Sequence, residues 1–469
     1  MVGMNTQNTT KNDQENYIKI KQYMAEGNFR AAEQLAKGEG QTHTAILLQR
    51  AANEVTESSE GKDKIKQLRD TYHYRAVNKQ KVTVTIVGEQ KITITSYYAL
   101  AGHKKRGRRK AGRNGSGSHI LLDYWGFHHK RSPGSFNEIT RCGTAAASCE
   151  LASEHLKSQD IKLSPKGVRA VTKKVGDVSV AKRTTHHLAL AEGESLAGKR
   201  VGIGCDGGRV RTRKNKTGRK NKIQRRTKRT RYYTDWMEPK LLVIYILDKY
   251  GNKKKGTKPI YEATMGGKKE FAELLISLCE QLHLNEAKEI VLLGDGAPVI
   301  WNVFEQLQTK LRIKGKTTEV VDFYHACEHI TELTEAHTNK SSKEQKAWFK
   351  ELKGLLRAGK HQAFIVSVKH EAKVHNLPLL LKHLNYFKRH KQRMHYDQYA
   401  KANLPIGSGT VESAVRRVIN LRLKAPGTFW KEENIDHMLS LRSALLSGRW
   451  DTFMSNFIQT ISIRPTMVE

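Results

Sequence analysis

The pattern of apolar and polar positions predicts a helical start to the chain, followed by a β-hairpin. Apolar residues recur at helical spacing within residues 1–75. They alternate with polar residues in 82–86 and again in 92–94, on either side of a turn at Gly88 and Glu89, as expected for two paired strands. The basic, glycine-rich stretch that follows is expected to form a mobile arm.

Residues 136–196 return to helical spacing. Ser164 and Pro165 form a second start signal, because Ser is favoured as an N-cap and Pro at the first helical position. We expect two helices joined by a short turn. This arrangement fits either a helix-turn-helix or an ordinary helical hairpin.

From residue 197 the pattern becomes α/β. Five short apolar runs follow one another, and among them are the runs that lead to Asp206, Asp295 and Asp322. Helical spacing between the runs predicts flanking helices, so we expect a mixed sheet. Residues 331–402 are basic and helical with no strand pattern. The predicted strands lie within residues 199–208, 241–248, 258–265, 289–298 and 318–325.

The charge of the chain is strongly positive. It carries 83 Lys and Arg against 46 Asp and Glu, a formal charge of +37. Residues 104–113 contain seven of these cations and residues 209–231 contain thirteen, so about +17 remains on the rest. An excess of this size is usual for proteins that neutralise phosphates, which predicts a nucleic-acid partner. A generally solvated basic surface is the alternative.

Cysteine usage and hydropathy bear on the compartment. The five cysteines form no C-x-x-C pair, which favours a reducing compartment over a disulfide scaffold. The longest strongly apolar run, residues 241–247, is far shorter than the roughly 20 residues that span a bilayer. We expect a cytoplasmic, nucleoid-associated protein with no membrane partner.

Three acids suggest a metal site. Asp206 and Asp295 each end an apolar strand and precede a glycine, and Glu412 lies in the first turn of a helix that follows residues 407–409. Carboxylates at neighbouring strand ends can meet at one sheet edge, and such a set suits two Mg²⁺ or Mn²⁺ ions that promote phosphodiester displacement. Taken singly, each aspartate also fits an Asp-Gly turn, and Glu412 fits a glutamate favoured by the helix dipole.

A competing motif is H-x-x-E-H, formed by His325, Glu328 and His329. Inverted zinc proteases have this spacing, with two His ligands on one helical face and the Glu as general base; Glu332 or Glu335 would be the third ligand. The motif arises readily by chance in a chain with 20 His, and a protease leaves the positive charge unexplained.

Four blocks of the sequence resemble the transposases of bacterial insertion sequences of the Kra type, relatives of the Mutator-like group. The likeness extends from about residue 200 to the C-terminal region and is weaker in the hairpin and the SPGSF segment. Many members of that family place zinc-type cysteines after the hairpin, where this chain reads YYALAGHKKRGRRK. The four blocks are GDGAPVIWN (294–302), VDFYHACEH (321–329), PIGSGTVESA (405–414) and LRSALLSGRWD (441–451).

The resemblance implies an α/β fold of the RNase H-like kind, a mixed sheet with helices on both faces that an all-α insertion interrupts. It also implies a catalytic, metal-binding triad of Asp206, Asp295 and Glu412. Asp322 and His325 match a D-x-x-H signature and would be auxiliary. They would position DNA or tune the site, with His325 handling a phosphate or a proton.

We therefore expect the 469-residue chain to consist of several modules and to act on DNA with other copies of itself. The expected partners are double-stranded DNA, both element ends and target, and further copies of the chain on DNA. The modules are a helical region (1–75), a hairpin with a basic arm (76–135), a helical DNA-binding region (136–196), the catalytic core (197–330 and 403–450), a helical insertion (331–402) and a tail (451–469). The residues expected to bind DNA are Lys104, Lys105, Arg106, Arg108, Arg109, Arg209, Arg211, Arg213, Lys214, Arg225, Arg226, Arg416 and Arg417.

The sequence therefore predicts a DNA transposase that cleaves transposon ends and joins them to target DNA by two-metal-ion chemistry. An RNase H-like nuclease or resolvase is an alternative, because the same metal chemistry serves both. A non-catalytic DNA-binding protein derived from a mobile element is another.

Overall fold

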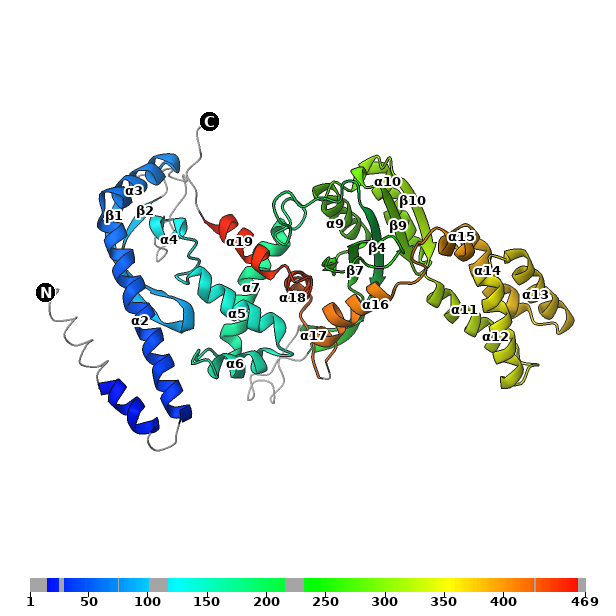
Figure 1. Cartoon of the computed structure of the whole chain (residues 1–469), viewed down its shortest axis with the longest axis horizontal. Helices are drawn as coiled ribbons and strands as arrows, with labels where there is room; N and C mark the ends of the chain where they lie inside the picture. The colour runs from blue at the N-terminus through cyan, green and yellow to red at the C-terminus, as the bar shows by residue number, and fades with distance from the viewer. Residues whose placement is uncertain are drawn as a thin grey trace. The chain divides into compact units, whose positions relative to one another are not determined.

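The computed structural model describes residues 15–24, 29–74, 76–100, 117–215, 232–425 and 427–462 (Figure 1). They belong to two compact units. The first draws on residues 1–143, 149–172 and 455–469, and the second on residues 144–148 and 173–454. In the described part of the chain, no helix has the length and apolar character needed to cross a membrane.

The first unit contains the predicted β-hairpin. Strands β1 (Ala76–Thr85) and β2 (Lys91–Leu100) pair antiparallel, and the short β3 (Gly117–His119) joins the other side of β2. Gly88 and Glu89 make the turn with positive φ angles of 67° and 59°. The basic arm expected after the hairpin lies outside the described residues.

Helices support this hairpin. α2 (Phe29–Glu57) lies along β2, where its Asn53 Oδ1 accepts a hydrogen bond from the Thr95 N–H at 2.7 Å. α3 (Ser59–Thr71) and α4 (Ile120–Tyr124) complete this part. Their buried residues Leu68 and Ile120 belong to one apolar cluster.

Three helices, and not the predicted two, follow in residues 133–182. α5 (Pro133–Ala145) and α7 (Pro165–Lys182) match the prediction, and α7 begins at the predicted Pro165. The prediction missed α6 (Cys149–Lys157) because this short helix buries only Ala152 and Leu156, too few positions for a clear helical pattern.

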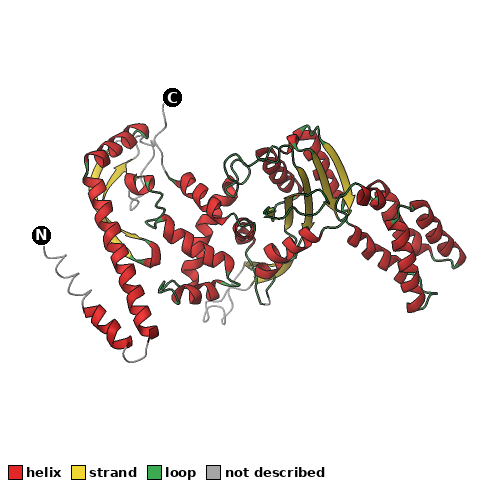
Figure 2. Cartoon of the chain, viewed as in Figure 1, coloured by secondary structure: helices red, strands yellow, loops and turns green. Residues whose placement is uncertain are grey.

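The second unit is built on a five-stranded mixed sheet, in which all five predicted strands are confirmed (Figure 2). The strand order is β10-β9-β4-β7-β8. β9 and β10 run parallel to β4, whereas β7 is antiparallel to its neighbours β4 and β8. The strands are β4 (Arg200–Gly207), β7 (Lys240–Ile246), β8 (Ile260–Thr264), β9 (Glu289–Gly294) and β10 (Lys316–Val321).

Helices cover both faces of the sheet. α10 (Pro298–Leu311) packs Ile300 and Trp301 against Gly294, and α9 (Lys268–Gln281) packs against α10. α16 (Gly409–Ala414) lies on the face that carries Gly204, because a Cβ atom at Gly204 would stand 2.3 Å from Val411 Cγ2. Side chains alternate between the two faces along β9, so Gly294 lies on the opposite face from Leu293. Leu293 pairs with Gly204, and α10 and α16 therefore cover opposite faces of the sheet.

A two-stranded ribbon, which the sequence did not predict, is inserted between β4 and β7. It consists of β5 (Val210–Asn215) and β6 (Tyr232–Met237), paired antiparallel. β5 lies in the second basic run, where Lys and Arg at successive positions hide the alternation of a strand. The remainder of that run, residues 216–231, lies outside the described residues.

Residues 331–402 are helical, as predicted, and contain no strand. Three tyrosine hydroxyls attach this segment to the sheet. Tyr386 donates to the carbonyl of Asp295 (2.8 Å), Tyr396 to that of Val321 (3.0 Å) and Tyr399 to that of Glu319 (3.2 Å). The helices are α11 (Phe323–Glu335), α12 (Ser342–Arg357), α13 (His361–Val374), α14 (Pro378–His390) and α15 (Tyr396–Lys401).

The segment after α16 is a π-helix, Val415–Asn420, followed by α17 (Leu421–Leu423). Its wide turn is held by Arg442 of α18 (Glu432–Leu446). The buried guanidinium donates to the carbonyls of Val418 (2.8 Å), Arg417 and Thr144 (3.1 Å). π-Helical turns are rare and often occur at functional sites. α19 (Trp450–Ile461) is the last described helix.

Candidate active site

Asp206 and Asp295 lie side by side at one edge of the sheet. Gly204 of β4 pairs with Leu293 of β9 in parallel register, and each aspartate stands two residues further along the chain, Asp206 within β4 and Asp295 directly after β9. Side chains at paired positions project from the same face, so both carboxylates lie on the face that α16 covers. Both aspartates are half-buried. The structure thus brings together two of the three predicted metal ligands.

The pKa of Asp206 is raised to about 6, chiefly by burial. The Gly207 N–H, 2.7 Å from Oδ1, and the His325 side chain oppose this shift, whereas the carboxylates of Asp295 and Glu238 add to it. The site therefore brings several carboxylates close together where water is partly excluded. Such an environment favours either a proton or a metal cation.

Glu238 is a neighbour of the site that the sequence analysis missed. It follows β6, and a Cβ atom at Gly207 would stand 2.3 Å from its carboxylate oxygen, so the glycine allows this close approach. The sequence gives no signal for it, because the exposed Glu238 belongs to the loop that returns from an unpredicted ribbon.

Glu412 lies in the first turn of α16, as predicted. The preceding residue, Val411, is buried against Gly204, which places α16 on the same face as the aspartates. The Glu412 side chain is exposed, and its Oε1 is 3.5 Å from Ser408 Oγ. Among the described residues, the three acids do not form a group whose ligand atoms all lie within 4.8 Å of one another.

Asp322 occupies the matching position on the third parallel strand, since Val321 pairs with Gly294. Its carboxylate is buried and fully engaged by backbone donors. Oδ1 accepts the N–H groups of Tyr324 (2.6 Å) and His325 (2.9 Å), and Oδ2 accepts that of Ser408. Asp322 therefore caps α11 and holds the loop that leads into α16.

His325 lies within electrostatic reach of Asp206. Its side chain is 37% exposed, and its charged form is close enough to lower the pKa of Asp206. Nδ1 of His325 lies 3.0 Å from Glu328, and Nδ1 of His329 lies 3.0 Å from Glu332. In the described chain no third ligand joins these two histidines, so the geometry of a three-ligand zinc site is not seen at the H-x-x-E-H motif.

The predicted DNA-binding residues fall into three places. Arg211, Arg213 and Lys214 lie on β5, directly after the exposed Arg209. Arg416 and Arg417 are exposed on the π-helix, a few residues beyond Glu412. The remaining predicted residues lie outside the described part of the chain: Lys104, Lys105, Arg106, Arg108, Arg109, Arg225 and Arg226.

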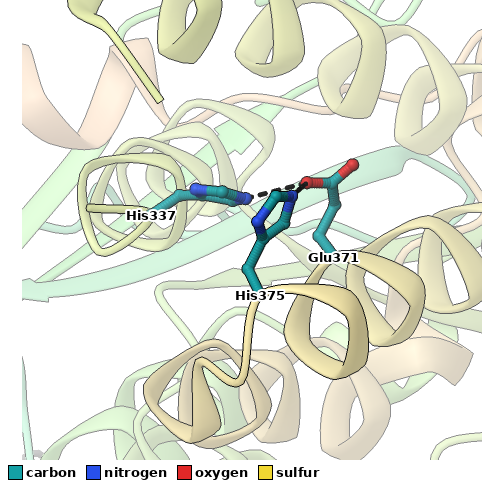
Figure 3. Close-up of side chains that lie close together, drawn as sticks. All are labelled: His337, Glu371 and His375. Carbon is teal, nitrogen blue, oxygen red and sulfur yellow. Dashed lines mark hydrogen bonds and ion pairs between the residues drawn. The ribbon is translucent and has the colours of Figure 1, made fainter. Parts of the chain in front are cut away.

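A separate cluster lies in the helical insertion (Figure 3). The Nε2 atoms of His337 and His375 lie 2.8 and 3.6 Å from the same oxygen of Glu371, and the three ligand atoms fit within 4.8 Å of one another. Lys340 also reaches that oxygen, at 3.1 Å. Burial tends to raise the pKa of Glu371, but hydrogen bonds from His337 and Lys340 outweigh it and lower the pKa. The cluster thus links the end of α11 to α13 as an ion network.

Comparison with known proteins gives no match: no family model, no curated protein and no solved structure matches the chain. The arrangement of the acids is therefore the basis for a functional assignment. It provides two adjacent, half-buried carboxylates, a third carboxylate on a helix docked to the same face, and basic side chains on both flanking segments. These are groups that hold divalent cations and attract phosphates.

Proposed function

We propose that the chain is a DNA transposase with an RNase H-like catalytic core, which cleaves transposon ends and joins them to target DNA. The strand order supports the fold assignment. An RNase H-like sheet has its first strand in the middle and its second strand antiparallel to the others, and here β4 is central and β7 is the antiparallel strand. The all-helical insertion ahead of α16 agrees with the resemblance as well.

One observation carries the proposal: Asp206 and Asp295 stand in matching register at the ends of adjacent parallel strands, next to the helix that bears Glu412. In open α/β sheets, ligands gather at the carboxyl ends of the strands. Two carboxylates held there, within a chain of formal charge +37, suit a site that binds a metal cation and a DNA phosphate together.

Mg²⁺ or Mn²⁺ fits these residues. The donors are hard carboxylate oxygens, and because burial and neighbouring acids raise the pKa of Asp206, a bound cation would favour its charged form. Asp206 and Asp295 would hold the ions, and Glu412 would complete the ligand set. When bound, the ions supply Lewis-acid activation of a water or a 3′-hydroxyl and stabilise the leaving oxygen. His325 would handle a phosphate or a proton beside them.

The decisive experiment uses the purified chain, DNA carrying the sequences that flank its gene, a supercoiled target plasmid, and Mg²⁺ or Mn²⁺. We expect products in which element ends are joined to the target. The Asp295→Asn variant should abolish cleavage and joining and leave DNA binding nearly intact, because a single acid is neutralised without loss of volume. Asp451→Asn, an exposed acid on α19, is the matched control. Normal joining by Asp295→Asn would refute the assignment.

The same assay separates the alternatives. Free ends without joined target indicate an RNase H-like nuclease or resolvase, and binding without cleavage indicates a non-catalytic DNA-binding protein.

Metal analysis tests the zinc protease, but the insertion also offers two His and one Glu to a metal. Zinc that is lost in His325→Ala and retained in His337→Ala would support the protease. The opposite result would place the zinc in the insertion.

A further inference from the structure

The β5–β6 ribbon exposes a row of aromatic and arginine side chains on one face. In its antiparallel register Arg211 pairs with Trp236, Arg213 with Thr234 and Asn215 with Tyr232, so these side chains share a face. Tyr232 is 41% and Trp236 48% exposed. The other face is partly buried: Val210 and Thr212 have relative exposures of 0% and 1%.

The members of this row lie close to one another. The Arg211 guanidinium lies 5.2 Å from the Trp236 ring centroid and 5.0 Å from that of Phe429. Arg213 lies 5.7 Å from the Tyr232 ring, which in turn is 5.9 Å from Phe429. Planar cations between aromatic rings are held in fixed orientations, and part of each outer ring remains open to solvent.

A neighbouring strand-like segment holds the row in place. The Arg213 N–H donates to the Trp430 carbonyl at 2.8 Å, and the Trp430 N–H donates to the Arg211 carbonyl at 2.9 Å. Phe429 is thereby aligned with the ribbon. The exposed residues are therefore set on a braced backbone, and their exposure does not come from a loose loop tip.

The ribbon begins and ends at the candidate active site. Val210 lies four residues after Asp206, and Met237 directly precedes Glu238, whose carboxylate helps to raise the pKa of Asp206. A DNA strand with a phosphate beside Asp206 and Asp295 would thus have its next nucleotides within reach of the ribbon. The charges match, because Arg211 and Arg213 on this face are cationic.

We propose that this face, formed by Arg211, Arg213, Tyr232, Trp236 and Phe429, binds unpaired bases of the DNA strand next to the cleaved phosphate. This inference rests on the proposed function and adds a substrate feature to it. Aromatic faces stack on bases that have left the duplex, whereas a paired base offers its face only to its neighbours. The arginines hold the aromatic rings and neutralise adjacent phosphates.

The test measures binding of fluorescent oligonucleotides by the full-length chain in EDTA, where no cleavage occurs. One duplex is blunt, and the other has the same sequence with a short single-stranded overhang at the cleaved end. We expect the wild-type chain to prefer the overhang about tenfold, and Trp236→Ala and Tyr232→Ala to lose that preference, because a stacked base contributes a factor of this order. Trp236→Phe should retain most of it.

Tyr250→Ala is the matched control. Tyr250 is 63% exposed and carries a lysine ammonium over its ring, but it follows β7 at the end of the sheet opposite Asp206. The preference should survive in this variant. Circular dichroism and thermal unfolding of each variant confirm that the fold is retained.

Each other outcome has a defined meaning. Equal binding of both DNAs by the wild type overturns the inference, as does an equal loss for both DNAs in Trp236→Ala, which would indicate a contact to duplex backbone. A change in oligomeric state without a change in DNA binding would make the ribbon a protein contact. If Trp236→Ala joins ends to target as the wild type does and retains the preference, the inference fails and the proposed function stands. If the wild type binds neither DNA, both fail.

Discussion

Asp295 and Asp322 occupy matching positions on adjacent parallel strands, yet their surroundings differ. The Asp295 carboxylate is half-buried beside Asp206, and Oδ1 accepts one backbone N–H, that of Ala297 at 2.7 Å. The Asp322 carboxylate is buried and accepts three backbone N–H groups. Strand register thus delivers three acids to one edge, but the local donors decide which of them remain available to a cation. Asp322 supports the fold, and Asp206 and Asp295 form the candidate site.

The largest effect should come from removing the supporting acid. Asp322→Ala leaves three backbone donors without their acceptor at a buried position, and we expect a loss of about 3 kcal/mol in the free energy of unfolding. Asp295→Ala should cost less than about 1 kcal/mol, because one half-buried hydrogen bond is lost. Urea unfolding of both variants measures the difference. Equal losses would show that the two acids do not differ in role.

Neutralising Asp206 should stabilise the protein at alkaline pH. Its pKa is raised from 3.8 to about 6 in the folded chain, so the protonated form favours folding. The protonated carboxyl group of Asp206 thus contributes to stability below pH 3.8, and this contribution is lost as the pH rises through about 6. Asp206→Asn should therefore be about 2 kcal/mol more stable than the wild type at pH 8 in EDTA, allowing for partial exposure, with the gain shrinking toward pH 4.

Thermal or urea unfolding across this pH range gives the measurement. Asp451→Asn serves as the control, because an exposed acid should change stability little at any pH. A pH-independent gain in Asp206→Asn would mean that packing, and not charge, separates the variant from the wild type.

A Cβ atom at Gly204 should displace the helix that carries Glu412. In Gly204→Ala the added atom would lie 2.3 Å from Val411 Cγ2, and overpacking of this kind costs roughly 1–3 kcal/mol. Under the proposed function, metal-dependent cleavage should fall more than tenfold, because a small misplacement of a catalytic group is sufficient for such a loss.

The double variant Gly204→Ala/Val411→Ala tests the mechanism. Shortening Val411 makes room for the added methyl group, so stability and cleavage should both recover in part. A double variant no better than the sum of the two single variants would place the defect elsewhere.

A smaller effect than at Asp322, Asp206 or Gly204 is expected at the backbone of the chain directly after β9. Tyr386→Phe removes the hydroxyl that donates to the Asp295 carbonyl at 2.8 Å, at a cost of about 1 kcal/mol. The carboxylate itself keeps its place, so DNA binding should be unchanged. Unfolding and binding assays together check this, with Tyr324→Phe, an exposed tyrosine on α11, as control.

Much of the second unit was predictable because its signals are local. The runs around Asp206 and Asp295 are apolar and end in Asp-Gly, which predicts both the strands and the acids at their ends. Glycines mark the break before α16, which predicts where that helix begins. The ribbon was missed because charge obscures its alternation. The support role of Asp322 depends on Ser408, 86 residues away, and no local pattern reveals such a contact.

The π-helix after α16 was also beyond prediction, because its apolar spacing at Val411, Val415 and Val418 reads as an ordinary helix. The contact that holds the π-helix comes from another helix, α18. Arg442, 24 residues after Val418, donates to the carbonyls of Val418 and Arg417.

Arg442 also has an electrostatic consequence. Burial and the nearby Arg422 and Arg417 lower the pKa of its guanidinium to about 10, so it still carries its proton at neutral pH. It is a fixed positive charge inside the protein, under a helix whose outer side bears further arginines. Arg442 therefore contributes to the positive potential of this helix in a way that neither side-chain motion nor substitution of surface residues removes. Salt also screens this buried charge less than it screens an exposed one.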